Sequence, residues 1–502
     1  MMGGGVSYHE RTAYRRGGLG GGFLDWNIRP EIFKTYQGLP TVALPKPEDL
    51  QRSSRPFFQV LFDPVLSVPD RLDFETLSRM LTLTYGITAQ SGRGADAFFF
   101  RSVPSAGALY PCELYVAVQG IVGLEDGLYH YDLARYRLVR LRSGRFLGSK
   151  ARWAAAFFVT TLFFRSSWKY RDRAYRYCLL DAGHLVENAL LVLHSEGIKA
   201  CVWDCFHDGE LNSFLGVDPQ REACVAVIAF SDEGSTKETE TTGSVSGEFC
   251  LLEKSHAWDM VQPEACRLSV SDKVPSAILE AHRATESTKA LGKVREGEAH
   301  EAVTPQGDQG KVRKIPRPNV VPEGLSFVES VWRRRSHRNY VPAHVSAQIW
   351  QTLWHSLHLD KALCEAVEIF IACGEAEDLP AGLYAWKASS QEAREILSGD
   401  FRRASAHACL DQEWLRHALF HVAYGVDWQK VFGIYGPRGY RSTLLDAGRL
   451  GQRLYLASTA LGMGCCGIGA YYDDELRTVF RLGSGWDVVY LTASGPVKKL
   501  RS

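Results

Sequence analysis

A cluster of arginines at residues 332–340 has the chemistry of a phosphate-binding site. The cluster reads Trp-Arg-Arg-Arg-Ser-His-Arg-Asn-Tyr. Guanidinium groups bind phosphate oxygens through paired, charge-assisted hydrogen bonds, and they keep their charge at every physiological pH. A serine hydroxyl adds a short donor. The candidate ligands are Arg334, Arg335, Ser336 and Arg338. The competing interpretation is a basic helix end that faces solvent.

A second candidate is the loop Pro104-Ser105-Ala106-Gly107, which precedes an alternating, β-branched and aromatic stretch at 113–118. That stretch is typical of a strand, and the small, proline-bounded residues before it indicate a tight loop. Short side chains allow a flat ligand to lie against the backbone and accept hydrogen bonds from its N–H groups. An ordinary turn before a strand is the alternative interpretation.

Lys169 and Tyr170 form the third candidate, a pair that could move a proton. A lysine acts as a base near neutral pH only when burial or a nearby positive charge lowers its pKa. Arg165, Arg171 and Arg173 lie close in sequence and would act in that direction. A surface lysine beside a packed tyrosine is the alternative.

Residues 101–111 closely resemble the flavin-contacting loop of SagB-type dehydrogenases, a branch of the nitroreductase superfamily. Other stretches match the same proteins in the same order, and together they cover most of residues 8–230. These stretches are residues 8–10, 24–26, 127–132, 168–177 and 181–184. The run at 332–340 also resembles the superfamily's Arg-Arg-Ser-x-Arg flavin signature.

The resemblance implies an α+β fold, FMN as cofactor and oxidation chemistry. In azoline-oxidising members, the pair matched by Lys169 and Tyr170 is implicated in removing a proton while hydride passes to FMN. Arg338 would reach the ribityl chain or the pyrimidine edge of the flavin. Relatives also contact the flavin ring and its phosphate near the C-terminus, at positions matched by Gly467, Ile468, Gly469, Lys498 and Arg501.

The chain contains an internal repeat that predicts two copies of this fold. Residues 170–183 align with residues 435–448 at a constant offset of 265, and Gly127-Leu128-Tyr129 recurs at 382–384. A period this long indicates duplicated domains. Since nitroreductase-type proteins form two-fold dimers with flavin at the interface, a tandem pair would build an intrachain pseudo-dimer.

The two copies differ at the candidate residues. The first half has no good copy of the arginine cluster, and Arg52-Ser53-Ser54-Arg55 is only a distant echo of it. The second half has no clear copy of residues 104–111, and Ile434 stands at the position of Lys169. We therefore expect one composite FMN site and one degenerate site.

Composition sets the class of protein. The 502 residues are 45% hydrophobic and 23% charged with a net charge of +1, which suits a soluble protein of several domains and gives no sign of nucleic-acid or membrane binding. There is no apolar stretch of membrane-spanning length or signal-peptide core, so a cytoplasmic location is expected. The twelve cysteines include no Cys-x-x-Cys zinc pattern, and they are interpreted as buried thiols, among them Cys201, Cys205, Cys465 and Cys466.

The expected domains are an extended N-terminal arm at 1–55, a first nitroreductase-like domain at 56–230, a linker at 231–322 and a second domain at 323–502. Each domain should have a mostly antiparallel sheet flanked by helices. A Gly-x-Gly-x-x-Gly pattern at 462–467 is not interpreted as a Rossmann loop, because it follows a helix and enters a strand. The expected elements are helices at 72–85 and 181–194, a hairpin at 127–141, a buried element at 154–164, strands at 201–203, 224–229 and 488–492, and short docked pieces at 250–252 and 274–282.

Three functions fit this sequence. The first is a SagB-type, FMN-dependent dehydrogenase that oxidises azoline rings in a modified peptide to azoles, with separate peptide-modifying enzymes as partners. The second is an NAD(P)H-dependent reductase of nitro, quinone or other small acceptors. The third is a degenerate flavin fold that serves as a scaffold, which the retained arginine cluster and the Lys-Tyr pair disfavour.

Overall fold

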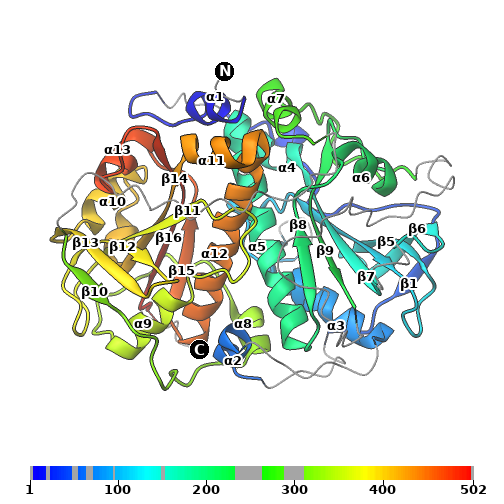
Figure 1. Cartoon of the computed structure of the whole chain (residues 1–502). Helices are drawn as coiled ribbons and strands as arrows, with labels where there is room; N and C mark the ends of the chain where they lie inside the picture. Colours follow the sequence, from blue (N-terminus) through cyan, green and yellow to red (C-terminus); the bar gives the residue numbers. More distant parts are fainter. Residues whose placement is uncertain are drawn as a thin grey trace. The chain divides into compact units, whose positions relative to one another are not determined.

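The computed structural model describes residues 4–18, 23–47, 55–63, 72–93, 97–147, 153–231, 263–287 and 310–498. The chain divides into two compact units. The first-half unit comprises Phe23–Ser53 and Asp63–Glu296, and the second-half unit comprises Met1–Gly22, Ser54–Phe62 and Gly297–Ser502. Both units are drawn in Figure 1, coloured by position along the chain.

The first-half unit is built on an antiparallel sheet of seven described strands. Alternating Val, Phe and Tyr residues fill its central strands, as expected for a sheet that is buried on both faces. Across the sheet the strands are β1 (Thr41–Ala43), β6 (Arg137–Ser143), β5 (Gly127–Asp132), β4 (Cys112–Val118), β7 (Ala155–Leu162), β9 (Glu222–Phe230) and β8 (Ala200–Trp203).

Helices cover both faces of this sheet. Phe158 of β7 packs with Phe214 of α6 on one face, and α5 packs on the sheet through β7, β9 and β4. A separate two-stranded ribbon, β2 (Ile87–Ser91) with β3 (Phe98–Arg101), leads into the candidate loop. The α-helices of this unit are α3 (Phe74–Tyr85), α4 (Phe163–Tyr170), α5 (Ala174–Ser195), α6 (Asp208–Leu215) and α7 (Ser276–Ala284).

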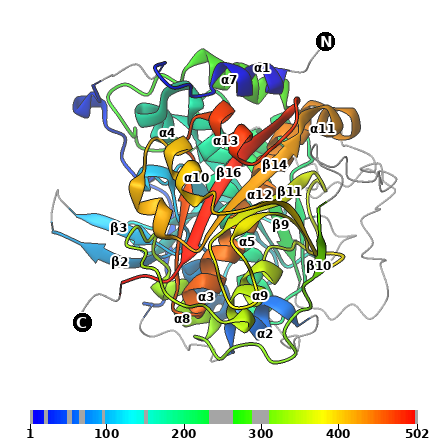
Figure 2. The same cartoon turned by 90° about the vertical axis from the view of Figure 1, so that its left-hand side faces the viewer.

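The second-half unit repeats the same strand order in another antiparallel sheet. The strands are β10 (Val312–Lys314), β13 (Glu392–Ser398), β12 (Gly382–Lys387), β11 (Val367–Cys373), β14 (Phe420–Asp427), β16 (Trp486–Gly495) and β15 (Gly464–Ile468). Figure 2 shows the long strands β14 and β16 side by side. Each strand therefore has a counterpart in the first-half unit, as expected for a duplication.

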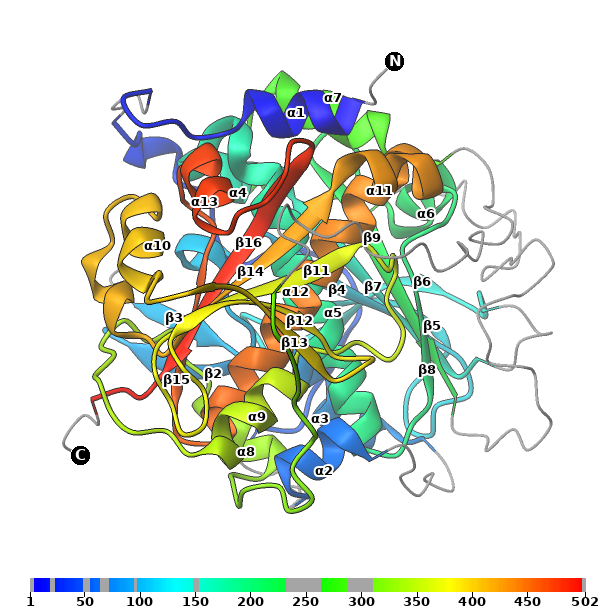
Figure 3. The same ribbon diagram turned by 60° about the vertical axis from the view of Figure 1, so that its left-hand side comes forward.

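Two opposite helix layers enclose this second sheet. Ala406 of α10 and Leu476 of α13 pack with Ala493 of β16, while Ser458 of α12 hydrogen-bonds Ser494 at 2.7 Å on the other face. Figure 3 shows α10 and α13 over β14 and β16. The α-helices are α1 (Gly4–Arg11), α2 (Phe57–Phe62), α8 (Phe327–Arg333), α9 (Ala347–His355), α10 (Arg402–Ala408), α11 (Trp428–Tyr435), α12 (Gly439–Ala460) and α13 (Asp473–Val479).

Most of the expected elements are present, with two differences. The helix expected from 181 begins at Ala174, because the segment 174–180 is as buried as the helix it joins. The N-terminal arm is not uniformly extended, since it contains α1 and a short 3-10 turn at Trp26–Ile28. The expected helix at 72–85 is confirmed as α3, whose N-cap Asp73 accepts a hydrogen bond from Thr76 N at 2.8 Å.

The N-terminal arm and the linker supply elements to both units. His9 of α1 lies 3.3 Å from the Tyr440 hydroxyl, within the second-half unit. Residues 274–282 form α7, whose His282 contacts the hydroxyl of Tyr175 at 3.1 Å within the first-half unit. Residues 250–252 lie outside the described ranges. The predicted domain boundaries stay predictions.

Two smaller expectations concern the cysteines and the membrane. Cys465 and Cys466 are buried thiols, whereas Cys201 and Cys205 are only half-buried. Among the described helices, none combines the length and the apolar character needed to span a bilayer.

Candidate functional site

The candidate loop of the first half is a tight turn with an unusual backbone. Gly107, Ala108 and Tyr110 all adopt positive φ angles, of 64°, 54° and 48°. For residues other than glycine this left-handed conformation is strained by roughly 1–2 kcal/mol each. Such strain persists only where the surroundings fix the backbone, and it clusters at functional sites. Pro104 is buried at the start of the loop, and Gly107 is exposed at its tip.

Asp181 of α5 holds the start of this loop. Its carboxylate accepts hydrogen bonds from the Ser105 hydroxyl at 2.6 Å and from Ala106 N at 3.2 Å. The Ser105 hydroxyl oxygen also accepts a bond from Tyr110 N at 2.9 Å, which closes the turn. Burial raises the pKa of Asp181 to about 7, although the bonds from Ser105 and Ala106 oppose that shift. The sequence placed Asp181 in the repeat, in the family-matching stretch 181–184 and in an expected helix, but gave it no role in the site.

The structure brings Gly107 next to Lys169 and Tyr170. A Cβ atom at Gly107 would lie 2.7 Å from the Tyr170 hydroxyl and 3.2 Å from Lys169 Nζ. The backbone therefore approaches both polar groups in a way that only glycine allows. Lys169 is exposed and Tyr170 is half-buried, so both are accessible at the surface of this unit.

The end of α4 fixes the Lys169–Tyr170 pair. Arg171, the next residue, has φ 51° and ψ −134°, a region that is strained for any side chain. The neighbouring Trp168 is anchored, because its indole Nε1 donates to the Asp25 carbonyl at 2.8 Å and its ring packs edge-on against Trp26. The helix therefore ends abruptly at the candidate pair.

Arg165, one turn earlier on α4, does not serve the role that the sequence suggested. Its guanidinium is buried and donates to Glu113 Oε1 at 2.5 Å and to the Tyr110 carbonyl at 3.0 Å. Glu113 thus compensates the positive charge that was expected to act on Lys169. Burial alone would raise the pKa of Glu113, but Arg165 and a hydrogen bond with His130 lower it to about 2. Arg165 instead ties the end of the loop to α4.

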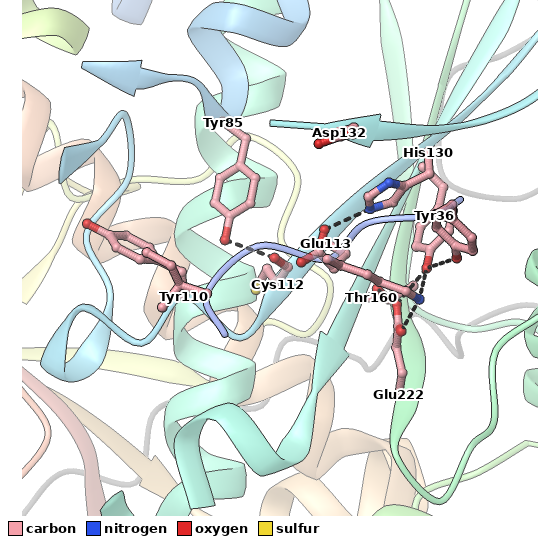
Figure 4. Close-up of polar contacts among 12 residues, drawn as sticks. Tyr36, Tyr85, Tyr110, Cys112, Glu113, His130, Asp132, Thr160 and Glu222 are labelled. Atoms are coloured by element: carbon pink, nitrogen blue, oxygen red, sulfur yellow. Dashed lines mark hydrogen bonds and ion pairs between the residues drawn. The ribbon is translucent and has the colours of Figure 1, made fainter. Parts of the chain in front are cut away.

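A second buried network anchors the N-terminal segment on this unit. Glu222 accepts hydrogen bonds from Lys34 at 2.5 Å, Tyr115 at 2.8 Å and Thr160 at 2.6 Å. Figure 4 shows this group together with the Glu113–His130 contact. Burial would lower the pKa of Lys34, yet the charge of Glu222 raises it above its ordinary value. Neither network appears in the sequence as a motif, because its members are far apart in the chain.

The arginine cluster lies in the second-half unit beside β15. Ser336 forms a parallel bridge with Cys465, and His337 N donates to the Cys465 carbonyl at 2.9 Å. The Ser336 hydroxyl is 2.9 Å from the Tyr455 hydroxyl, which accepts a bond from Gly467 N at 2.6 Å. Ser336 and Gly467, both predicted from sequence, therefore share one neighbour. Tyr455 was not predicted.

The four candidates of the cluster differ in their surroundings. Arg334 is 2% exposed and lies over the Tyr455 ring, whereas Ser336 and Arg338 are exposed. Arg335 donates to the carbonyl oxygens of Trp332 and Arg334, at 3.0 and 2.6 Å. One guanidinium nitrogen of Arg335, Nη1, is thus used by the local backbone, while Ser336 and Arg338 are the exposed side chains of the four.

The remaining predicted residues lie close by or outside the described ranges. Lys498 is exposed, and its backbone N–H donates to the Asn339 carbonyl at 3.0 Å, which places it next to the cluster. Ile468 is buried and Gly469 is half-buried at the end of β15. Arg501 lies outside the described ranges.

The counterpart of the loop in the second half has a different structure. Glu365 N donates to the Tyr435 hydroxyl at 3.1 Å. Tyr435 corresponds to Tyr170, so in this half the tyrosine hydroxyl accepts a hydrogen bond from the backbone. Asp446, the counterpart of Asp181, accepts bonds from Leu363 N at 2.7 Å and Cys364 N at 2.8 Å. With Ile434 in place of Lys169, this half lacks the lysine of the candidate pair.

The residues present fit FMN, which was expected from the family resemblance. Exposed Ser336 and Arg338 supply hydrogen-bond donors and a positive charge for a phosphate. Gly107 is exposed at the loop tip, and because it has no side chain its backbone is accessible to a flat ligand. Each of these two sets of residues lies within one unit.

The chain resembles several curated proteins and solved structures. A protein of Methanocaldococcus jannaschii that is named as a nitroreductase is 31% identical over 157 residues, covering 29% of this chain and 75% of that protein. The trifolitoxin-processing protein TfxB of Rhizobium leguminosarum bv. trifolii is 28% identical, covering 32% of this chain and 48% of TfxB. The microcin B17-processing protein McbC of Escherichia coli is 28% identical, covering 27% of this chain and 56% of McbC. This chain thus spans about half the length of the two processing proteins.

Two further comparisons cover both halves. The sequence model described as the nitroreductase family matches residues 68–232 and 331–495. A crystal structure from Anabaena variabilis, also named as a nitroreductase, aligns over 99% of this chain and 100% of its own, with a TM-score of 0.77 and 26% identity. The predicted tandem fold and the predicted family resemblance are confirmed.

Proposed function

Because this chain belongs to the nitroreductase family, with one matched domain in each half, we propose that it is an FMN-dependent dehydrogenase that oxidises azoline rings in a modified peptide to azoles. The oxidoreductase class follows from the family. The peptide substrate is suggested by the two relatives named for processing trifolitoxin and microcin B17. Separate peptide-modifying enzymes would make the azolines, and the reaction would take place in the cytoplasm.

The observation that carries this proposal is the contact of Gly107 with Lys169 and Tyr170. A base must lie within reach of the proton that it removes, and general-base catalysis contributes roughly 10²–10⁴-fold. Lys169 Nζ lies 5.5 Å from the centre of the Tyr170 ring, beside the open backbone of Gly107. A ring that rests on Gly107 would be within reach of both side chains.

The proposed step removes two hydrogens from the azoline ring. FMN, when bound, accepts one of them as a hydride. Lys169 takes the other from the ring carbon as a proton, and Tyr170 orients the pair through its hydroxyl. The azoline ring would thus lose one hydrogen as a hydride and one as a proton, and it would gain the double bond of the azole.

The second-half unit supplies candidate phosphate donors. Ser336 and Arg338 are its exposed donors, Arg334 is buried beside the Tyr455 ring, and Lys498 contributes charge from the neighbouring strand end. We propose that these residues bind a phosphate and that the 104–107 loop binds a flavin ring, while the counterpart of this loop in the second half is degenerate.

The first test counts flavin and then follows a single turnover. Purified protein should release about one FMN per chain. Under anaerobic conditions an azoline-containing peptide should bleach the visible flavin band, and the peptide should lose the mass of two hydrogens. Bleaching by NAD(P)H, with no change of mass in the peptide, would instead favour a reductase of nitro or quinone acceptors. A protein that takes up no added FMN would support the scaffold interpretation.

A further inference from the structure

The repeated Leu-Leu-Asp-Ala-Gly run lies on the long central helix of each half, at residues 179–183 and 444–448. In both halves the aspartate accepts backbone N–H groups from the loop that precedes the central strand of the sheet, β4 or β11. Asp181 accepts Ala106 N, and Asp446 accepts Leu363 N and Cys364 N. The repeat therefore preserves a contact between helix and loop.

The two aspartates differ in how their charge is balanced. Asp446 forms an ion pair with Arg449 at 2.8 Å, one turn along α12. His184 stands at the corresponding position of α5. The nearest donors to Asp181 are instead the Ser105 hydroxyl and Ala106 N, both part of the loop. The carboxyl group of Asp181 is thus directed at the loop itself, where it accepts hydrogen bonds from two donors of that loop.

The loop that Asp181 holds is strained and ends beside the candidate base. Positive φ angles at Gly107, Ala108 and Tyr110 oppose the ordinary preference of the chain. Ser105 links the carboxylate to Tyr110 N, so one contact constrains both ends of the strained stretch. Releasing it would let the backbone relax and move Gly107 away from Lys169 and Tyr170.

We propose that Asp181 is a positioning residue, whose carboxylate holds the 105–110 loop in its strained conformation with Gly107 against Lys169 and Tyr170. The effect of this positioning on flavin binding rests on the proposed function, since the loop is where the flavin ring would lie. Asp446 holds the corresponding loop of the second half, which does not bind the flavin ring in this proposal.

The experiment compares Asp181→Asn with Asp446→Asn in the full chain without flavin, using amide hydrogen exchange followed by mass spectrometry. Asp181→Asn should speed exchange of the 105–110 amides by about tenfold, the effect of weakening a hydrogen bond to a charged group. Exchange at 363–365 should stay unchanged. Asp446→Asn should give the reverse pattern. Unchanged exchange at 105–110 in Asp181→Asn, or equal acceleration in both loops, would overturn the assignment.

Two further variants guard against misfolding. Ser105→Ala removes the other partner of the contact, and combined with Asp181→Asn it should add little to the local exchange rate, as expected for residues that act together. Additive effects would contradict the assignment. If Asp446→Asn does not fold because it leaves Arg449 buried, Tyr435→Phe loosens the same second-half loop by removing the acceptor for Glu365 N.

FMN binding then connects the contact to function. The apparent Kd for FMN should rise about tenfold in Asp181→Asn and less than twofold in the second-half variant. A wild-type chain that binds no FMN would refute the proposed function, while the exchange data would still decide the positioning role. Equal Kd values in wild type and Asp181→Asn would overturn the assignment, because the loop would then not serve the flavin.

Discussion

The two halves of this chain share a strand order, yet they differ at the loop before the central strand. In the first half the loop before β4 is strained and ends at Gly107, beside Lys169 and Tyr170. In the second half the loop before β11 uses its Glu365 N–H to bind the Tyr435 hydroxyl, and Ile434 replaces the lysine. The comparison indicates that duplication preserved the framework, while among the described residues only the first half places a lysine and a tyrosine beside a strained loop.

Replacing Lys169, the proposed base, should have the largest effect of the changes that test this difference between the halves. Lys169→Met keeps the length of the side chain but cannot accept a proton, so the rate of anaerobic flavin bleaching by an azoline peptide should fall at least about 100-fold. Stopped-flow absorbance measures this rate. Ile434→Lys in the second half is the matched control and should leave the rate within a factor of two. A Lys169→Met variant that bleaches flavin at the wild-type rate would rule out the lysine as base.

Breaking the buried ion pair between Lys34 and Glu222 should lower the stability of the first-half unit. Lys34→Met leaves the buried carboxylate of Glu222 without its cation, which typically costs about 3–5 kcal/mol. Denaturant unfolding, followed by hydrogen exchange in β4 and β9, measures the loss. The double variant Lys34→Met/Glu222→Leu removes both charges and should recover most of the stability. Failure to recover would mean that packing of the segment, rather than charge, accounts for the loss.

Neutralising Asp181 should stabilise the fold at high pH. Its folded-state pKa of about 7 lies above the ordinary value of 3.8, so the stability that this group contributes is fully present below about pH 4 and is lost as pH rises to about 7. The ionisable groups affected by its charge are the thiols of Cys112 on β4 and Cys178 on α5, whose pKa values burial keeps raised.

Asp181→Asn should therefore gain stability over wild type through that pH interval, up to about 4 kcal/mol above pH 7, with no difference near pH 4. Thermal unfolding at several pH values measures the gain. A difference that does not depend on pH would contradict this account. A gain in stability together with faster exchange in the loop would show that the contact costs stability and serves function.

The smallest effect is expected at the residues that follow Tyr170 and its counterpart Tyr435. Arg171 has φ 51°, while its counterpart Gly436 has φ 59° with no side chain to strain. Arg171→Gly should raise the unfolding free energy by about 1 kcal/mol, because relief of strain outweighs the extra entropy of glycine in the unfolded chain. Gly436→Ala is the converse and should lower stability by about the same amount. Both changes are measured by thermal unfolding, and a destabilised Arg171→Gly variant would contradict the strain.

The sequence by itself determined the family, the tandem fold and most of the elements. Local patterns can be recognised from the order of residues along the chain. They include the repeat at 170–183 and 435–448, the small residues at 104–107 and the cluster at 332–340. The helix α3 could be predicted because its cap and its apolar spacing lie within one short stretch. The absence of Lys169 from the second half was equally visible.

Only the tertiary structure decided which of these residues meet. The contact of Gly107 with Lys169 and Tyr170 joins residues more than 60 positions apart, and Asp181 reaches Ser105 across 76. The role of Arg165 was misjudged from sequence because its partner, Glu113, lies on a different element, 52 positions away. Charges and hydrogen bonds depend on distance in space, which neither composition nor spacing along the chain specifies.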